Sequence, residues 1–154
     1  MIELDIDLNK SVTKTFRQLV VDALNFDVAK IVMKGGRSSF KSAVAVIIVI
    51  LGCVMHERSC LCIVKTDKST KDKIANNIKK FITILGLDNM FEYMATNQRF
   101  ILLDANGNRT KHVIRIMGAN KPDEIKSMTP DEPDGYAHTF IEEAALFKTE
   151  SDLN

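Results

Sequence analysis

Apolar residues in the first part of the chain form one helical pattern and three continuous runs. Before residue 25 they recur every three or four positions, which predicts an amphipathic helix carrying Val12, Phe16, Leu19, Val20, Ala23 and Leu24. The runs Ile31–Met33 and Cys60–Val64 predict two short buried strands. Between them, Ala43–Met55 is almost wholly apolar and predicts a helix buried between a sheet and an outer layer. This run falls well short of the ~20 residues needed to cross a bilayer.

The second half of the chain predicts another helix, a hairpin and a last strand. Ser69 is expected to cap the helix with Asp72 as its partner, and Gly86 to end it. Its buried stripe is predicted to be Ile74, Ile78, Phe81, Ile82 and Leu85. Two strands flanking Asn106-Gly107 predict the hairpin, and they are Arg99–Leu103 and His112–Met117. The remaining elements are expected to be a short helical turn at Asp123–Ser127, a loop at Thr129–Gly135 and a strand at Tyr136–Ile141.

This alternation of strands and helices predicts one α/β domain around a largely parallel sheet, with the hairpin as an antiparallel insertion or edge. The length of 154 residues suits a single domain. The 21 basic and 20 acidic residues give a net charge of +1, so the overall charge does not indicate a nucleic-acid partner. Any such contact must come from a local patch. One helix does carry Lys71, Lys73, Lys79 and Lys80, which form either a solvated face or a DNA-facing patch.

The cysteines and histidines of the chain predict neither a disulfide framework nor a metal site. The cysteines are three in number, lie among apolar residues and are expected to be reduced core thiols: Cys53, Cys60 and Cys62. The histidines are scattered without metal-ligand spacing, at His56, His112 and His138. The N-terminal residues Met1–Asn9 lack the basic region of a secretory signal.

The segment Gly35–Ser42 joins a predicted strand to a predicted helix and fits the phosphate-binding P-loop, G-x-x-x-x-G-K-S, with one departure. Its residues are Gly35, Gly36, Arg37, Ser38, Ser39, Phe40, Lys41 and Ser42. In such a loop backbone N–H groups and the helix N-terminus converge on a polyphosphate, the Lys contacts the β and γ phosphates, and the Ser hydroxyl ligates Mg²⁺. Phe40 stands where the second glycine should be. We expect it to keep an ordinary φ, with its ring packed against the sheet or a neighbouring helix. The alternative is a plain helix N-cap at Ser38 or Ser39.

An acidic pair, Glu142-Glu143, ends the last predicted strand. Adjacent residues on a regular strand face opposite sides, so both can serve one site only where the backbone turns at the strand end. The small residues Ala144-Ala145 allow that turn. The alternative is a solvated helix start.

Three blocks of sequence carry a family resemblance. They are Lys34–Ser42, close to a GGR-S-S-G-K-S loop; Ile114–Ser127, a strand followed by Gly, a short turn and Ile-Lys-Ser; and Phe140–Ala144, which looks like a Walker B strand. In this order and spacing they resemble the ATPase domain of the large terminase subunit of tailed phages, particularly its PBSX-like family. The resemblance implies a P-loop NTPase-like three-layer sandwich. Since the chain ends eleven residues after Glu143, residues 1–154 would be a partial ATPase domain without the nuclease domain.

The resemblance also implies an activity, site residues and partners. ATP hydrolysis would power translocation of double-stranded DNA into the procapsid, with the portal protein, the small terminase subunit and further copies of the chain as partners, in the host cytoplasm and away from membranes. Gly35–Ser42 would bind ATP, and Ser42 and Glu142 would hold Mg²⁺. Glu143 would orient the attacking water, and Arg37 would act in cis on the γ-phosphate.

Other functions and site residues stay open at this point. The chain could be a non-catalytic remnant that keeps the fold and nucleotide binding, or a helicase-like P-loop ATPase, against which Ile114–Ser127 argues. Gln18 could contact adenine, although glutamines are common. Asp131, Glu132 and Asp134 could bind metal, but they lack the fixed spacing of a cation loop and suit a solvated loop better.

Overall fold

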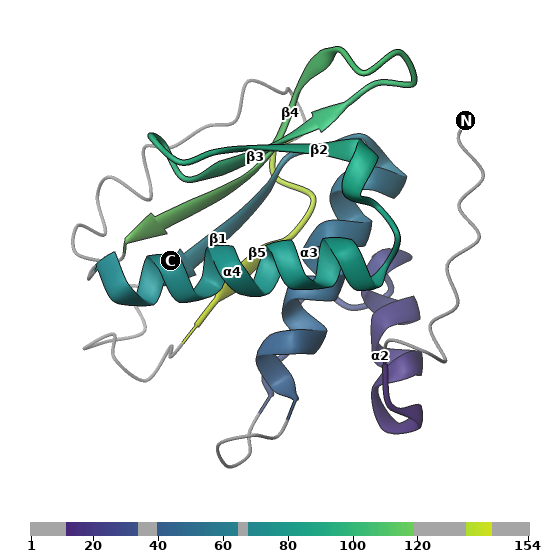
Figure 1. Cartoon of the computed structure of the whole chain (residues 1–154). Helices are drawn as coiled ribbons and strands as arrows, with labels where there is room; N and C mark the ends of the chain where they lie inside the picture. The colour runs from purple at the N-terminus through teal and green to yellow at the C-terminus, as the bar shows by residue number, and fades with distance from the viewer. Residues whose placement is uncertain (1–11, 34–39, 65–67, 119–134, 143–154) are drawn as a thin grey trace.

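A computed structural model of the chain describes residues 12–33, 40–64, 68–118 and 135–142, and every structural statement below refers to these. Its centre is a five-stranded sheet with the strand order β2-β3-β4-β1-β5 (Figure 1). The strands are β1 (Cys60–Val64), β2 (Phe91–Met94), β3 (Arg99–Leu103), β4 (Arg109–Gly118) and β5 (Thr139–Ile141). Strand β1 is buried along its whole length, as expected of a central strand.

The sheet is mixed, not largely parallel as predicted. Strands β4, β1 and β5 run parallel, whereas β2, β3 and β4 pair antiparallel. The predicted hairpin of β3 and β4 is confirmed, but β2 was missed and adds a second antiparallel pair. Its four residues are too few to show a periodicity, and only pairing with β3 defines them as a strand.

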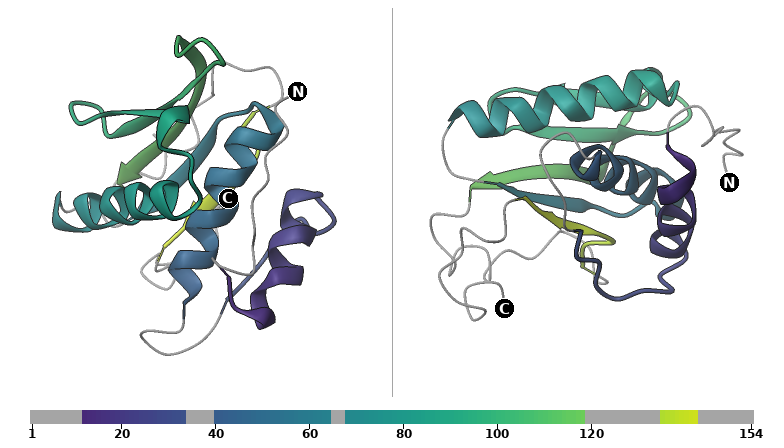
Figure 2. Two further views of the ribbon diagram at one scale, coloured as in Figure 1. Left: turned by 45° about the vertical axis from the view of Figure 1, so that its right-hand side comes forward. Right: turned by 90° about the horizontal axis from the view of Figure 1, so that it is seen from below.

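Three helices accompany the sheet: α2 (Lys14–Leu24), α3 (Lys41–His56) and α4 (Lys68–Ile84). A single 3₁₀ turn, η1 (Asp88–Met90), precedes β2. Helix α3 packs against both α2 and α4, and α3 and α4 both lie against β1 and β4 (Figure 2). Their buried side chains join alternate residues of β1, β3 and β4 in one core. The predicted α/β class is therefore confirmed, while within the described residues the helices cover one face of the sheet. The third layer stays a prediction.

Helix α3 is buried along most of its length. Eleven consecutive residues, Val44–Val54, are buried, so the helix is enclosed on all sides as its apolar run predicted. No helix in the described part of the chain is long and apolar enough to cross a membrane.

Helix α4 ends as predicted but begins differently. Gly86 adopts the left-handed φ of +72° that glycine tolerates, and the N–H of Leu87 donates to the carbonyl of Ile82 at 2.9 Å. The predicted capping role of Ser69 is wrong, because Ser69 lies inside a helix that starts at Lys68. Several capping-type residues precede this helix, and the apolar period alone does not choose among them.

The predicted strand at Ile31–Met33 is also wrong. Ile31 and Met33 pack against the core and Val32 is 66% exposed, so the segment keeps the alternation of a strand. No described strand pairs with it. An extended segment needs a ladder partner to become a strand, and the sequence pattern reports only the alternation.

Candidate active site

The site is built around the first turn of α3. Phe40 is its N-cap residue, with φ 65° and ψ 4°, and it makes no side-chain capping hydrogen bond. The first turn carries no acidic side chain. The N-terminal N–H groups of a helix lack intrahelical partners and carry partial positive charge, so this end of α3 suits an anion.

The prediction that Phe40 keeps an ordinary φ and packs its ring is wrong. Its φ is positive, a conformation that glycine adopts freely and other L-residues adopt at a cost of about 1–2 kcal/mol. Its side chain is 45% exposed, so the ring is not packed into the core. The backbone at this position therefore has the geometry expected of a P-loop glycine, although a phenylalanine occupies it.

Ser42, in the first turn of α3, lies beside Glu142, the residue after β5. The hydroxyl of Ser42 donates to Glu142 Oε1 at 3.3 Å, and the contact joins residues one hundred positions apart. This distance exceeds the 2.7–2.8 Å usual for O–H···O bonds, so the contact reports proximity more than bond strength. Both oxygens are partly buried at the same point of the molecule.

The main chain fixes Glu142 in this position. Its N–H donates to the carbonyl of Ile63 at 2.9 Å, which continues the pairing of β5 with the central strand β1. Parallel strands of α/β sheets present ligands at their carboxyl ends. A hydroxyl and a carboxylate at this edge are the hard oxygen donors that Mg²⁺ prefers, and a magnesium ion there would take its other ligands from water and phosphate. No group of three or more potential His, Cys, Asp or Glu ligands is preformed in the described residues.

The buried thiol of Cys62 lies near the carboxylate of Glu142. Burial, the neighbouring Cys60 and the carboxylate of Glu142 raise the pKa of Cys62 well above its usual range. The group therefore stays a neutral thiol. Cys53, Cys60 and Cys62 are all buried thiols outside disulfides, as the sequence predicted.

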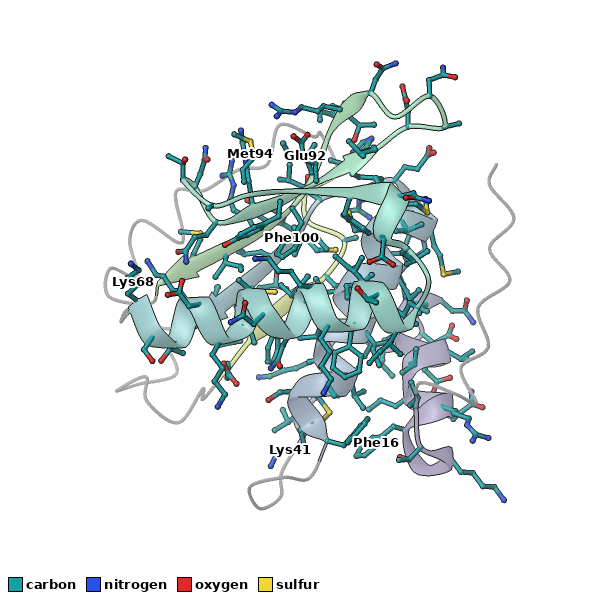
Figure 3. All side chains as sticks on the ribbon, in the orientation of Figure 1. Phe16, Lys41, Lys68, Glu92, Met94 and Phe100 are labelled. Carbon is teal, nitrogen blue, oxygen red and sulfur yellow. The ribbon has the colours of Figure 1, made fainter. Side chains whose placement is uncertain are left out.

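Lys41 is the first residue of α3 and is half-buried (Figure 3). The other predicted loop residues, Gly35, Gly36, Arg37, Ser38 and Ser39, lie outside the described residues, as does Glu143. The structure thus brings together Ser42 and Glu142, with Lys41 adjacent to Ser42 in sequence. The roles assigned to all of these residues stay predictions.

The residues weighed as alternatives gain little support. The Gln18 side chain donates to Asp22 Oδ1 at 2.7 Å on the exposed side of α2, so its amide is engaged within its own helix. Asp131, Glu132 and Asp134 lie outside the described residues.

An aromatic cluster that the sequence did not reveal supports the start of β5. The ring of His138 stacks on Phe26 at a centroid distance of 5.2 Å, and Phe26 lies 4.5 Å from His56. Phe26 follows α2 in the left-handed region with φ 57°, and Nε2 of His56 bonds the carbonyl of Leu24 at 2.7 Å. The cluster thus ties the end of α2 and the end of α3 to the strand that leads to Glu142.

Gly52 makes this cluster possible. A Cβ at Gly52 would lie 2.2 Å from Cδ2 of His138, so only glycine lets that ring pack on the α3 backbone. Burial, with His56 and Arg58 nearby, lowers the pKa of His138 to about 4, and the ring is therefore neutral at pH 7. The one available signal was a lone glycine inside an apolar helix, which often marks close packing.

The family model of the phage terminase large subunit matches residues 28–154, which is most of the chain. The matched range includes Gly35–Ser42, Ile114–Ser127 and the pair Glu142-Glu143. No curated protein and no solved structure matches the chain. The matched family is that of the large subunit as a whole, so assignment to its PBSX-like subfamily stays a prediction.

Proposed function

We propose, because the chain belongs to the phage terminase large-subunit family, that its α3–β5 site binds ATP·Mg²⁺ and hydrolyses ATP to drive DNA packaging. The observation that carries the proposal is the 3.3 Å contact between Ser42 Oγ and Glu142 Oε1. It supports a shared metal site because it joins the last P-loop residue to the first residue of the acidic pair. We further propose that the chain is the N-terminal part of a P-loop NTPase-like, three-layer ATPase domain.

In the proposed reaction, water attacks the γ-phosphorus, the bond to the β-γ bridging oxygen breaks, and ADP and inorganic phosphate leave. Catalysis of this kind depends mainly on positioning and on charge stabilisation. Lys41 would place its ammonium group against the terminal phosphates, and Ser42 and Glu142 would hold the magnesium ion. Bound magnesium supplies charge neutralisation at the phosphates. Glu143 would orient the water, and Arg37 would stabilise charge on the γ-phosphate.

The proposed partners follow from the packaging role of the family. Hydrolysis would move double-stranded DNA into the procapsid at the portal protein, together with the small terminase subunit and further copies of the chain. This work would take place in the host cytoplasm.

Titration calorimetry with ATP·Mg²⁺ tests the binding step. Lys41→Ala should weaken binding at least about tenfold, or about 1.4 kcal/mol. Lys14→Ala, which removes an exposed lysine on α2, should leave the affinity unchanged. Equal affinities for the wild type and Lys41→Ala would remove the basis for the site.

A double-mutant cycle tests whether Ser42 and Glu142 share one ion. Ser42→Ala and Glu142→Gln should each weaken ATP binding in the presence of Mg²⁺, and the double variant should lose little more than either single one. Without Mg²⁺ the three variants and the wild type should bind alike. Additive losses, or losses that do not depend on Mg²⁺, would contradict the shared site.

Phe40 supports a second candidate, a protein that keeps the fold and binds nucleotide weakly without turnover. Its Cβ stands at a position where P-loops have none, although the backbone φ of 65° is that of a glycine. Phe40→Gly separates the two functions. A large gain in ATP affinity would mean that the side chain obstructs the phosphate site and would favour the second candidate.

A further inference from the structure

Helix α4 carries an unusual concentration of positive charge. It contains five lysines and one aspartate, Asp72. The whole chain has 21 basic and 20 acidic residues. Without the charged residues of α4 it has 16 basic and 19 acidic residues, so α4 is a basic helix in an otherwise acidic chain. Exposed helix faces ordinarily intersperse both signs, which supports i,i+4 ion pairs.

The outer face of α4 presents a continuous stripe of hydrogen-bond donors. Positions i, i+4, i+7, i+8 and i+11 fall on one side of a helix, and here they are Ser69, Lys73, Asn76, Asn77 and Lys80, which we call the basic stripe. Four of the five are exposed and Asn77 is half-exposed, whereas the opposite face buries Ile74, Ile78 and Phe81 in the core. A shallow open depression runs along its first turns, lined by Lys68, Ser69, Asp72, Lys73, Asn76 and Asn77.

The only carboxylate of α4, that of Asp72, forms no ion pair with the stripe lysines in the described part of the chain. Asp72 Oδ1 accepts a hydrogen bond from Gln98 Nε2 at 3.2 Å, in the turn between β2 and β3. An ion pair within the described residues joins Arg109 on β4 to Glu92 on β2. Lys73 and Lys80 are in no ion pair among the described residues, and the Lys80 ammonium lies 5.7 Å from the centroid of the Phe81 ring.

We propose that the basic stripe contacts the phosphate backbone of double-stranded DNA without reading its sequence. Lys73 and Lys80 are about 10 Å apart along the axis, and each strand of B-DNA carries a phosphate about every 3.4 Å. Lysine acts as a point charge toward phosphate, and serine and asparagine donate to phosphate oxygens. The first turn of α4 lies on the side of the molecule where β4 ends, so the stripe begins near the carboxyl ends of the parallel strands (Figure 1).

The chemistry of the stripe favours a duplex over a single strand. Single-strand sites stack bases on exposed aromatic rings. The one aromatic residue of α4, Phe81, is buried, and the nearby Tyr93 ring is covered by the ammonium of Lys79 at 3.9 Å. The inference rests on the packaging role of the family and not on the ATP site.

The test is fluorescence anisotropy with the full chain and a labelled duplex of about 30 base pairs at about 50 mM salt, without nucleotide. Lys73→Gln/Lys80→Gln should weaken binding at least tenfold. It should also lower the salt slope, log K against log salt, by about 1.8, since each phosphate contact contributes about 0.9. The matched control is Lys14→Gln/Lys111→Gln, which removes two exposed charges from α2 and β4 and should weaken binding less than twofold. A single isosteric change, Asn76→Asp, should weaken binding as well, and unrelated duplex sequences should bind alike.

Several results would overturn the inference. The inference fails if the wild type does not bind the duplex, or if it binds single-stranded DNA or RNA more tightly than the duplex. It also fails if the stripe variant loses no affinity, or loses only as much affinity as the control variant. ATP·Mg²⁺ titration of the stripe variant in the absence of DNA should match the wild type. A failure of the stripe and a failure of the ATP site are therefore seen in separate measurements.

Discussion

Replacing Phe40 by glycine and, separately, by alanine tests the backbone conformation at the N-cap of α3, beside the candidate site. Both substitutions remove the same ring, which is 45% exposed, so each loses about half of the ~1.5–3 kcal/mol of a fully buried side chain, or about 1 kcal/mol. The two variants differ in backbone strain, because residue 40 has a left-handed φ of 65°. Glycine relieves about 1–2 kcal/mol of left-handed strain, whereas alanine keeps it.

The expected order of stability follows from these terms. Glycine loses about 0.5–1 kcal/mol more chain entropy on folding than alanine does, so its net advantage at position 40 is about 0.5–1 kcal/mol. Phe40→Gly should therefore unfold near the wild-type free energy, and Phe40→Ala should be less stable by about 1 kcal/mol. Urea denaturation followed by circular dichroism gives both values with a common slope.

The control for this prediction is an exposed position in the middle of α4. At Asn76 the backbone is helical, so alanine should be more stable than glycine there by about 1 kcal/mol, the reverse of the order at position 40. If Phe40→Ala is as stable as Phe40→Gly, the residue is not left-handed in solution. The glycine-like backbone geometry at residue 40 would then lose its support.

Two further predictions concern the cluster behind β5. Gly52→Ala would normally stabilise a helix by about 1 kcal/mol, but here the new Cβ would lie 2.2 Å from the His138 ring and should destabilise the protein by about 1–3 kcal/mol. In a double-mutant cycle measured by urea denaturation, Gly52→Ala/His138→Ala should recover most of the stability that the clash removes. Additive effects of the two substitutions would contradict the contact. Burial holds the pKa of His138 at about 4 in the folded protein, against 6.5 in the unfolded chain. Between these two pH values the unfolded state binds more protons, so the free energy of unfolding should fall as the pH drops from 6.5 to 4. For a partly exposed ring we expect a loss of about 1 kcal/mol. His138→Asn should remove that part of the pH dependence, and an unchanged pH profile would show that the ring is not buried neutral.

The fold could be predicted wherever a local pattern decides the structure. The apolar run of α3, the buried strand β1 and the turn at Gly86 were predicted from periodicity and from glycine chemistry, and the structure contains all three. Strand β2 and the segment Ile31–Met33 were not predicted correctly, because strand formation there depends on a partner and not on the segment itself.

The candidate site was predictable in its residue types but not in its geometry. Lys41, Ser42 and Glu142 were selected from the sequence, and the structure adds that Ser42 and Glu142 meet. The positive φ of Phe40 could not be predicted, because a bulky residue rarely adopts it and only the surrounding chain imposes it. The contact of Gly52 with His138 joins two distant elements, and no local pattern reports such a contact.

The burial of α3 explains how the chain sustains strain next to the site. Both ends of this helix have non-glycine residues in the left-handed region, Phe40 before it and Glu57 after it, at about 1–2 kcal/mol each. Eleven consecutive buried residues between them contribute far more than that, at about 1.5–3 kcal/mol for each large apolar side chain. The helix can therefore hold an unfavourable backbone at its first turn without shifting. Ser42 lies in that turn, and Glu142 is held by a main-chain bond to the buried strand β1, so both candidate ligands are attached to well-packed elements.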